Sequence, residues 1–240
     1  MVDTFLGKKL EDLFGYDHYV KNILKDIDNH IKYNDFLNSI GEVRSINYLL
    51  YGPPGTGKTS LITSIATLKQ YPVYIVNPNM IQGNNLKFLL SPPKRVESPI
   101  QILLFEDFDR YLENDNINDV MSQILNSLSG LDDNGKTIRF FTANSIEKIF
   151  NNHALVNRMS AKFKFDNPTV EIFRGKLMRL LSFYTAPDIE KTEHFLQLVE
   201  NKNISTDVKI TVRSFTNYVL RYLFEDNYLD KMIENISELN

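Results

Sequence analysis

Short apolar runs that can form buried strands recur through the first two thirds of the chain. They alternate with segments of helical spacing or polar loops and lie at Asn47–Tyr51, Val73–Val76, Ile100–Phe105, Ile138–Thr142 and Ala161–Phe165. Alternation of strands with helices favours a parallel sheet covered by helices on both faces. The pattern predicts an α/β fold with a five-stranded parallel sheet flanked by helices.

Helical spacing of apolar residues dominates the remaining segments. It predicts helices over 10–36, 60–68, 168–184, 189–200, 211–224 and 228–238. No strand pattern follows Phe165, and Asn167-Pro168 resembles a helix N-cap with proline in the first turn. We therefore predict two domains, an α/β domain over 1–166 and a small helical domain over 167–240.

Composition and charge narrow the classes of function. The 240 residues include 27 basic and 30 acidic ones, so the chain lacks the basic excess typical of general nucleic-acid binding. It contains no cysteine, which excludes disulfides and thiolate chemistry, and its four histidines are too scattered to suggest a metal cluster. The longest apolar runs are far shorter than the roughly 20 residues of a membrane helix. We expect a soluble intracellular protein, with the cytoplasm as its compartment.

A glycine-rich loop with a complete phosphate-binding motif follows the first predicted strand and precedes a predicted helix. It fits G-x-x-x-x-G-K-[ST], and with the next residue it comprises Gly52, Pro53, Pro54, Gly55, Thr56, Gly57, Lys58, Thr59 and Ser60. The glycines let backbone N–H groups curl around phosphate oxygens, and Lys58 supplies a mobile positive charge near the β- and γ-phosphates. Thr59 is expected to bind magnesium. The loop predicts a P-loop NTPase that binds Mg-ATP.

Adjacent carboxylates follow the apolar strand that ends at Phe105. Glu106 and Asp107 come at the carboxyl end of this strand, which is the edge where open α/β sheets bind ligands. Hydrolysis of ATP needs one carboxylate to hold magnesium and another to orient or deprotonate the attacking water. We assign magnesium to Glu106, together with Thr59, and the role of general base to Asp107. The reverse assignment of the two carboxylates stays open.

These motifs resemble the AAA branch of the AAA+ ATPases. The resemblance rests on residues 48–60 and on Leu13-Phe14-Gly15-Tyr16, which is similar to the short adenine-pocket segment of that family. The order Glu106-Asp107 resembles the Bcs-type ATPases, mitochondrial chaperones that translocate a folded iron–sulfur protein, whereas most AAA proteins have Asp-Glu. The segment before Gly52 is too short for the membrane helix and N-terminal domain of the Bcs type, so we expect neither.

The resemblance implies further site residues and a homo-oligomeric ring. It implies that Phe14 and Gly15 belong to the adenine pocket, that Asn144 polarises the attacking water, and that Arg158 reaches the γ-phosphate of a neighbouring subunit. The usual Arg-Pro-Gly-Arg segment is missing, and Arg158 matches its second arginine after a short deletion. Arg158 as a surface salt-bridge partner and Asn144 as a turn-forming residue are the alternative interpretations.

One leading hypothesis and two alternatives follow. The leading hypothesis is a soluble AAA+ ATPase, with a nucleotide-binding domain and a helical lid, that couples ATP hydrolysis to remodelling or translocation of a macromolecular client, with protein favoured. The alternatives are a DNA-replication motor or clamp-loader-like ATPase and a nucleotide-dependent adaptor with little turnover. Met80–Gly83 is a weak match to a substrate-gripping loop, and Lys94-Arg95 fits either contact with nucleic acid or solvated surface.

Overall fold

The structure is a computed structural model that describes residues 9–42, 44–76, 100–112, 117–129, 136–184 and 187–239. The chain divides into two compact units. Unit 1 comprises Met1–Leu10, His18–Gly52 and Lys58–Lys164, and unit 2 comprises Glu11–Asp17, Pro53–Gly57 and Phe165–Asn240. The domain limits 1–166 and 167–240 stay a prediction.

Unit 1 is built on a parallel sheet. Its strands are β1 (Ile46–Tyr51), β2 (Val73–Val76), β3 (Gln101–Phe105), β4 (Thr137–Ala143) and β5 (Ala161–Lys164). The sheet is five-stranded in the order β2-β3-β4-β1-β5, and every neighbouring pair is parallel. This confirms the predicted fold class. The crossover order places β4 at the centre of the sheet, flanked by β3 and β1, where parallel strands are buried on both faces.

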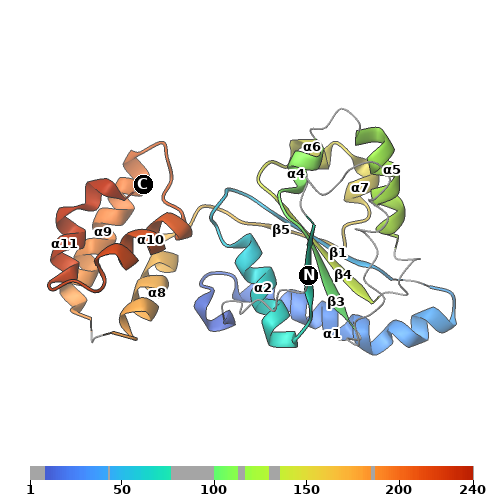
Figure 1. The fold of residues 1–240 in the computed structure, drawn as a ribbon, viewed down its shortest axis with the longest axis horizontal. Helices are drawn as coiled ribbons and strands as arrows, with labels where there is room; N and C mark the ends of the chain where they lie inside the picture. Colours follow the sequence, from blue (N-terminus) through green and yellow to red (C-terminus); the bar gives the residue numbers. More distant parts are fainter. Residues whose placement is uncertain are drawn as a thin grey trace. The chain divides into compact units, whose positions relative to one another are not determined.

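Helices cover both faces of this sheet. They are α1 (Asp17–Ser39), α2 (Lys58–Lys69), α4 (Phe108–Tyr111), α5 (Ile117–Ser127), α6 (Glu147–Phe150) and α7 (His153–Val156). Figure 1 shows α1 and α2 on one face and α4 to α7 on the other. Phe105 and Phe141 stack with their ring centroids 4.6 Å apart in the apolar core that also contains Ile124 of α5 and Leu155 of α7.

The opening helix begins later than its apolar spacing predicts. The segment starts with a short 3-10 turn, Leu10–Asp12, and α1 begins only at Asp17. The interruption contains Gly15, whose φ of 81° lies in the left-handed region that a right-handed helix cannot include. The prediction of one helix from residue 10 was therefore wrong over its first turns.

Unit 2 contains the helical C-terminal region, as predicted. Its helices are α8 (Val170–Leu181), α9 (Ile189–Ser205), α10 (Val212–Tyr222) and α11 (Tyr228–Glu234), followed by the 3-10 turn Ile236–Glu238. Phe173, Phe195 and Phe215 are fully buried in a shared apolar core. The predicted cap at Asn167-Pro168 was wrong, because Thr169 is the extended residue that precedes the first turn of α8.

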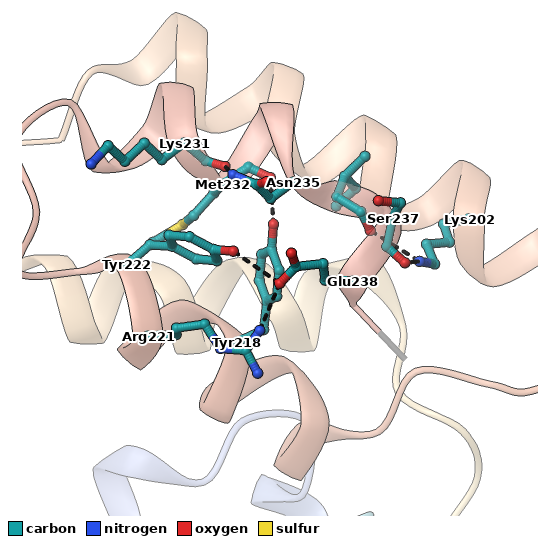
Figure 2. Close-up of polar contacts among 10 residues, drawn as sticks. Lys202, Tyr218, Arg221, Tyr222, Lys231, Met232, Asn235, Ser237 and Glu238 are labelled. Atoms are coloured by element: carbon teal, nitrogen blue, oxygen red, sulfur yellow. Dashed lines mark hydrogen bonds and ion pairs between the residues drawn. The ribbon is translucent and has the colours of Figure 1, made fainter.

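Polar side chains tie the C-terminal segment of unit 2 to its helices (Figure 2). The Tyr218 hydroxyl donates to the carbonyl of Met232 at 2.6 Å, and Lys202 Nζ donates to the carbonyl of Ser237 at 2.6 Å. Glu238 Oε2 accepts from Arg221 at 2.7 Å and from the Tyr222 hydroxyl at 3.0 Å. We call these seven residues the C-terminal network. It satisfies a carbonyl in the last turn of α11, which has no partner within the helix.

Candidate active site

The strand order brings three predicted site segments to one edge of the sheet. Strand β1 pairs with β4 up to Tyr51 and Ala143, and β3 pairs with β4 up to Phe105 and Phe141. Gly52, Glu106 and Asn144 directly follow these strands, and the Gly52 N–H donates to the carbonyl of Ala143 at 3.1 Å. Carboxyl ends of parallel strands form the ligand-binding edge of open α/β sheets.

Lys58 is the first residue of α2 and is held between backbone and side-chain oxygens. Its Nζ donates to the carbonyl of Gly52 at 2.7 Å and to Asn144 Oδ1 at 3.1 Å. Burial lowers the pKa of Lys58 to about 8, while the charges of Asp107 and Asp109 act in the opposite direction. This ammonium is poorly hydrated, and an added anion would stabilise its charge.

The predicted magnesium ligands lie together. Thr59 follows Lys58 in α2, and its hydroxyl donates to Glu106 Oε1 at 3.1 Å. A hydroxyl and a carboxylate are hard oxygen donors of the kind that magnesium prefers, and magnesium usually binds one or two carboxylates together with water and substrate phosphates. No group of three or more His, Cys, Asp or Glu side chains that could hold a metal occurs in the described part of the chain. This donor pair fits a magnesium ion that is shared with a bound phosphate.

Asp107 has an unusual backbone conformation and a defined side-chain partner. Its φ of 49° and ψ of 48° are left-handed, and its N–H donates to the Thr142 hydroxyl at 3.2 Å. Asp107 Oδ1 accepts from the Asn144 amide nitrogen at 3.1 Å, and Oδ2 lies 3.7 Å from Arg110 Nε. The Asn144 amide therefore links Lys58 on one side to Asp107 on the other. We call Lys58, Thr59, Glu106, Asp107 and Asn144 the sheet-edge cluster.

Arg158 is held at a separate place in unit 1. It follows α7, its guanidinium donates to the carbonyl of Ala154 at 3.0 Å, and its own carbonyl accepts from the buried Asn47 side chain at 2.9 Å. Among the contacts of the described residues, none joins Arg158 to the sheet-edge cluster. The structure thus does not bring Arg158 into the cluster of its own chain.

The tip of the glycine-rich loop, Pro53–Gly57, belongs to unit 2. The carbonyl of Thr56 accepts from the Tyr16 hydroxyl at 2.7 Å, and the Thr56 hydroxyl donates to the carbonyl of Pro53 at 2.8 Å. Gly55 has a φ of 75°, and a Cβ there would come within 2.9 Å of the side chain of Thr211, the N-cap of α10. Close packing and positive φ therefore both require glycine at position 55. Ser60, the last residue of the predicted loop, lies in the first turn of α2 in unit 1.

The predicted adenine-pocket residues also lie in unit 2, against α8. Phe14 covers Gly175 so closely that a Cβ on this glycine would come within 2.5 Å of the ring. Gly15, with φ of 81°, faces Ile172 at 2.8 Å by the same measure. Arg179 anchors the segment by bonding to Asp12 at 2.7 Å. Phe14 and Gly15 are thus ordered by helix contacts within their unit.

Several residues of the site were not predicted. Asp109 and Thr142 contact the main chain around the cluster, and Tyr16 contacts the loop tip. The sequence does indicate that Asp109 lies near the site, because it extends the acidic run Glu106-Asp107-Phe108-Asp109. Its contact with the end of β4, however, depends on the strand order. Met80–Gly83 and Lys94-Arg95 lie outside the described residues.

Comparison with known proteins settles the family. A model of the "ATPase family associated with various cellular activities (AAA)" matches residues 48–167. This range includes Lys58, Glu106, Asp107, Asn144 and Arg158. The chain belongs to the AAA ATPase family. The predicted family is therefore confirmed.

Relatives of this AAA ATPase match most of its length. It is 27% identical over 231 residues to an AAA-ATPase of Arabidopsis thaliana, with 90% of this chain and 50% of that protein covered. It is 27% identical over 250 residues to the "probable mitochondrial chaperone BCS1-A" of Dictyostelium discoideum, with 97% and 55% covered. It is 25% identical over 239 residues to HYPER-SENSITIVITY-RELATED 4 of Arabidopsis thaliana, with 90% and 38% covered.

The chain spans between 38% and 55% of the length of these relatives. The similarity to a BCS1 protein agrees with the resemblance to the Bcs type that the order Glu106-Asp107 indicates. Within the described residues, the structure has no helix whose length and apolar character would suit a membrane span.

Proposed function

We propose that this AAA ATPase hydrolyses Mg-ATP with the sheet-edge cluster. The observation that carries the proposal is the position of the Asn144 amide, which accepts from Lys58 and donates to Asp107, both at 3.1 Å. The candidate phosphate-binding cation and the candidate general base therefore share one neutral polar side chain at the ligand-binding edge. A water held by Asn144 and Asp107 would lie close to the phosphate that Lys58 attracts.

Each residue of the cluster has a defined role in this proposal. Lys58 binds the phosphates of ATP, and Gly52–Ser60 contribute backbone N–H groups and the start of α2. Thr59 and Glu106 hold a magnesium ion, which supplies positive charge to the phosphate oxygens. Asp107 accepts the proton of the attacking water, and Asn144 orients that water. Phe14 and Gly15 contact the adenine.

We further propose that hydrolysis belongs to a homo-oligomeric ring. Lys58 is the one cation among the five residues of the cluster, and Arg110 lies beside Asp107 at 3.7 Å, while negative charge accumulates on the transferred phosphoryl group in the transition state. Arg158 does not contact its own cluster, so we assign its guanidinium to the site of a neighbouring copy. An arginine supplied in this way contributes about 10³–10⁵-fold in well-studied GTPases.

The task that we propose is remodelling or translocation of a macromolecular client, with protein favoured. The similarity to a protein named as a mitochondrial chaperone supports it, and so does the nearly balanced charge of the chain. Binding to nucleic-acid phosphates would release counterions, so DNA-stimulated turnover that falls steeply with salt would instead support the DNA motor. An assembled sample that binds ATP without turnover would support the adaptor.

A mixing experiment tests the shared site. Arg158→Ala and Lys58→Ala should each bring turnover near zero for different reasons, and a mixed ring should place an intact arginine next to some intact ATP sites. We expect part of the turnover to return when the two variants are mixed, as measured by phosphate release. Lys162→Ala, which removes an exposed cation from β5, should keep turnover. A mixture that co-assembles but stays inactive, or an active Arg158→Ala, would remove Arg158 from the mechanism.

A further inference from the structure

Asp109 is a buried carboxylate next to the sheet-edge cluster and has no role in the proposed function so far. It lies in α4, and only 9% of its surface is exposed. Its Oδ2 atom accepts two backbone N–H groups, from Asn144 at 3.2 Å and from Ser145 at 2.9 Å. A carboxylate is costly to bury unless strong donors compensate it, so these two bonds hold a group that would otherwise prefer water.

The two N–H groups belong to the segment that begins directly after β4. The side chain of Asn144 projects from this segment and reaches both Lys58 and Asp107 at 3.1 Å. Asp107 is fixed to the same strand, because its N–H donates to the Thr142 hydroxyl at 3.2 Å. Two sets of contacts thus join the segment after β3 to the end of β4. The Asp109 side chain accepts from the main chain after β4, and the Thr142 side chain accepts from the main chain after β3.

We propose that Asp109 is a positioning residue that fixes the main chain of Asn144 and Ser145, so that the Asn144 amide stays between Lys58 and Asp107. This inference rests on the proposed hydrolysis of ATP. Asp109 itself touches neither the phosphate-binding Lys58 nor Asp107 through a hydrogen bond among the described contacts. Its Oδ1 atom has no hydrogen-bond partner within the described residues, so Oδ2 makes the hydrogen bonds of this carboxylate.

Loss of the carboxylate should affect the chemical step more than ATP binding. Without the Asp109 carboxylate, the backbone N–H of Asn144 loses its acceptor. The side chain of Asn144 can then move away from the attacking water. A misplacement of about 1 Å can lower the rate of a positioned reaction about 10²-fold. Lys58 and the glycine-rich loop remain. The charge of Asp109 acts to raise the pKa of Lys58, so the affinity for ATP should change little well below pH 8, where Lys58 stays charged.

A double-mutant cycle in the full chain tests whether Asp109 acts through Asn144. We expect Asp109→Ala to lower kcat about 10- to 100-fold while the Kd for ATP stays within about threefold. In the Asn144→Ala background the same change should lower kcat no further, because the side chain that Asp109 positions is already absent. Asp109→Asn keeps an oxygen acceptor and should retain more of the activity, which also covers the case in which Asp109→Ala folds poorly.

Hydrogen exchange gives a readout that does not depend on turnover. Exchange of the amides of Asn144 and Ser145, measured without nucleotide, should accelerate at least about tenfold in Asp109→Ala and much less in Asp109→Asn. Asp188→Ala serves as the matched control, because Asp188 also accepts a backbone N–H, from Lys191 at 3.1 Å, but at the start of α9. It should lower Tm without changing kcat.

The outcomes separate this inference from the proposed function. Equal losses of kcat from Asp109→Ala in the wild-type and Asn144→Ala backgrounds would overturn the positioning role, as would unchanged exchange of the two amides. Absence of turnover in the assembled wild-type protein would instead refute the proposed hydrolysis. In that case faster amide exchange in Asp109→Ala would still support the contact but would leave it without a catalytic purpose, which overturns the inference as stated.

Discussion

The sheet-edge cluster of unit 1 and the C-terminal network of unit 2 both join polar side chains by hydrogen bonds, but they differ in how well the fold accommodates their charged groups and their backbone. In the C-terminal network, Tyr218 and Lys202 donate to backbone carbonyls, and Glu238 receives two donors (Figure 2). At the sheet edge, Lys58 has a lowered pKa and Asp107 has a left-handed backbone. The C-terminal network stabilises the fold of unit 2. The sheet-edge cluster instead holds a poorly hydrated lysine, whose charge a bound anion would stabilise.

Backbone strain reinforces the difference. Among the described non-glycine residues, Gln70, Asp107 and Asn227 have positive φ. This conformation costs roughly 1–2 kcal/mol for most residues, although Asp and Asn tolerate it better because their side chains can bond locally. Asp107, the candidate general base, is one of the residues that adopt this conformation. The conformation is retained because the Thr142 hydroxyl and the Asn144 amide both hold Asp107.

The largest effect should come from the cation of the cluster. Lys58→Ala removes the mobile charge that faces the phosphates, and removal of a charge-stabilising donor typically lowers turnover about 10²–10³-fold or more. Phosphate release should fall below detection. Lys69→Ala changes the other end of the same helix, where the lysine pairs with Asp28 at 2.6 Å, and should keep turnover. Similar rates of ATP hydrolysis by the two variants would mean that Lys58 has no special role, and the sheet-edge cluster would then not differ from other polar groups of the fold.

The lowered pKa of Lys58 predicts a specific pH dependence of ATP binding. Burial lowers this pKa to about 8 in the nucleotide-free protein, and bound phosphates should raise it again because they stabilise the charged form. Below pH 8 the lysine is charged in both states, so the affinity should be constant. Above pH 8 binding must take up a proton, and the Kd should rise by up to about tenfold per pH unit.

Calorimetry checks this linkage directly. Titrations of ATP at pH 9 in two buffers with different ionisation enthalpies report the number of protons taken up on binding. We expect a value approaching one proton, and the ATP phosphates do not contribute because phosphate monoesters titrate near pH 6. Binding without proton uptake at pH 9 would contradict this linkage, because the charge of Lys58 would then be the same in the free and the bound protein.

The C-terminal network should give the smallest effect, and only on stability. Tyr218→Phe leaves the buried carbonyl of Met232 without its donor, which costs about 1–3 kcal/mol and lowers Tm by roughly 2–4 °C per kcal/mol in a chain of this size. Tyr184→Phe is the control, because the ring of Tyr184 is 53% exposed. It should leave Tm nearly unchanged. Turnover at low temperature should be normal in both variants, and a loss in Tyr218→Phe would mean that the network also serves catalysis.

Local sequence patterns were sufficient to predict much of this architecture. The apolar runs predicted all five strands to within one residue at each end. The signal is plainest in β3 and β4, which are buried on both faces, and weaker in β5, where exposed and buried residues alternate. The start of α1 and the cap of α8 were missed, since Gly15 and Thr169 decide them through backbone conformation rather than apolar spacing. The Lys58, Asp107 and Asn144 segments could be assigned to one edge because each follows a strand.

Contacts between segments that lie far apart in the sequence could not be predicted. Asp109 bonds to Ser145, and Tyr16 bonds to Thr56, across sequence separations of 36 and 40 residues. No local pattern encodes such pairs. The lowered pKa of Lys58 is likewise a consequence of its burial in the folded chain. The roles of all these residues in hydrolysis stay predictions.

Single-turnover hydrolysis by Asp107→Asn and Glu106→Gln, each titrated with magnesium, tests the central claim most directly. The account predicts that Asp107→Asn binds ATP normally but hydrolyses it at least about 10²-fold more slowly at every magnesium concentration, as expected for loss of a general base. Glu106→Gln should regain turnover as magnesium rises. An exchange of the two phenotypes would move the base to Glu106, and near-normal hydrolysis by both variants would contradict the claim that this sheet edge is the site of the chemistry.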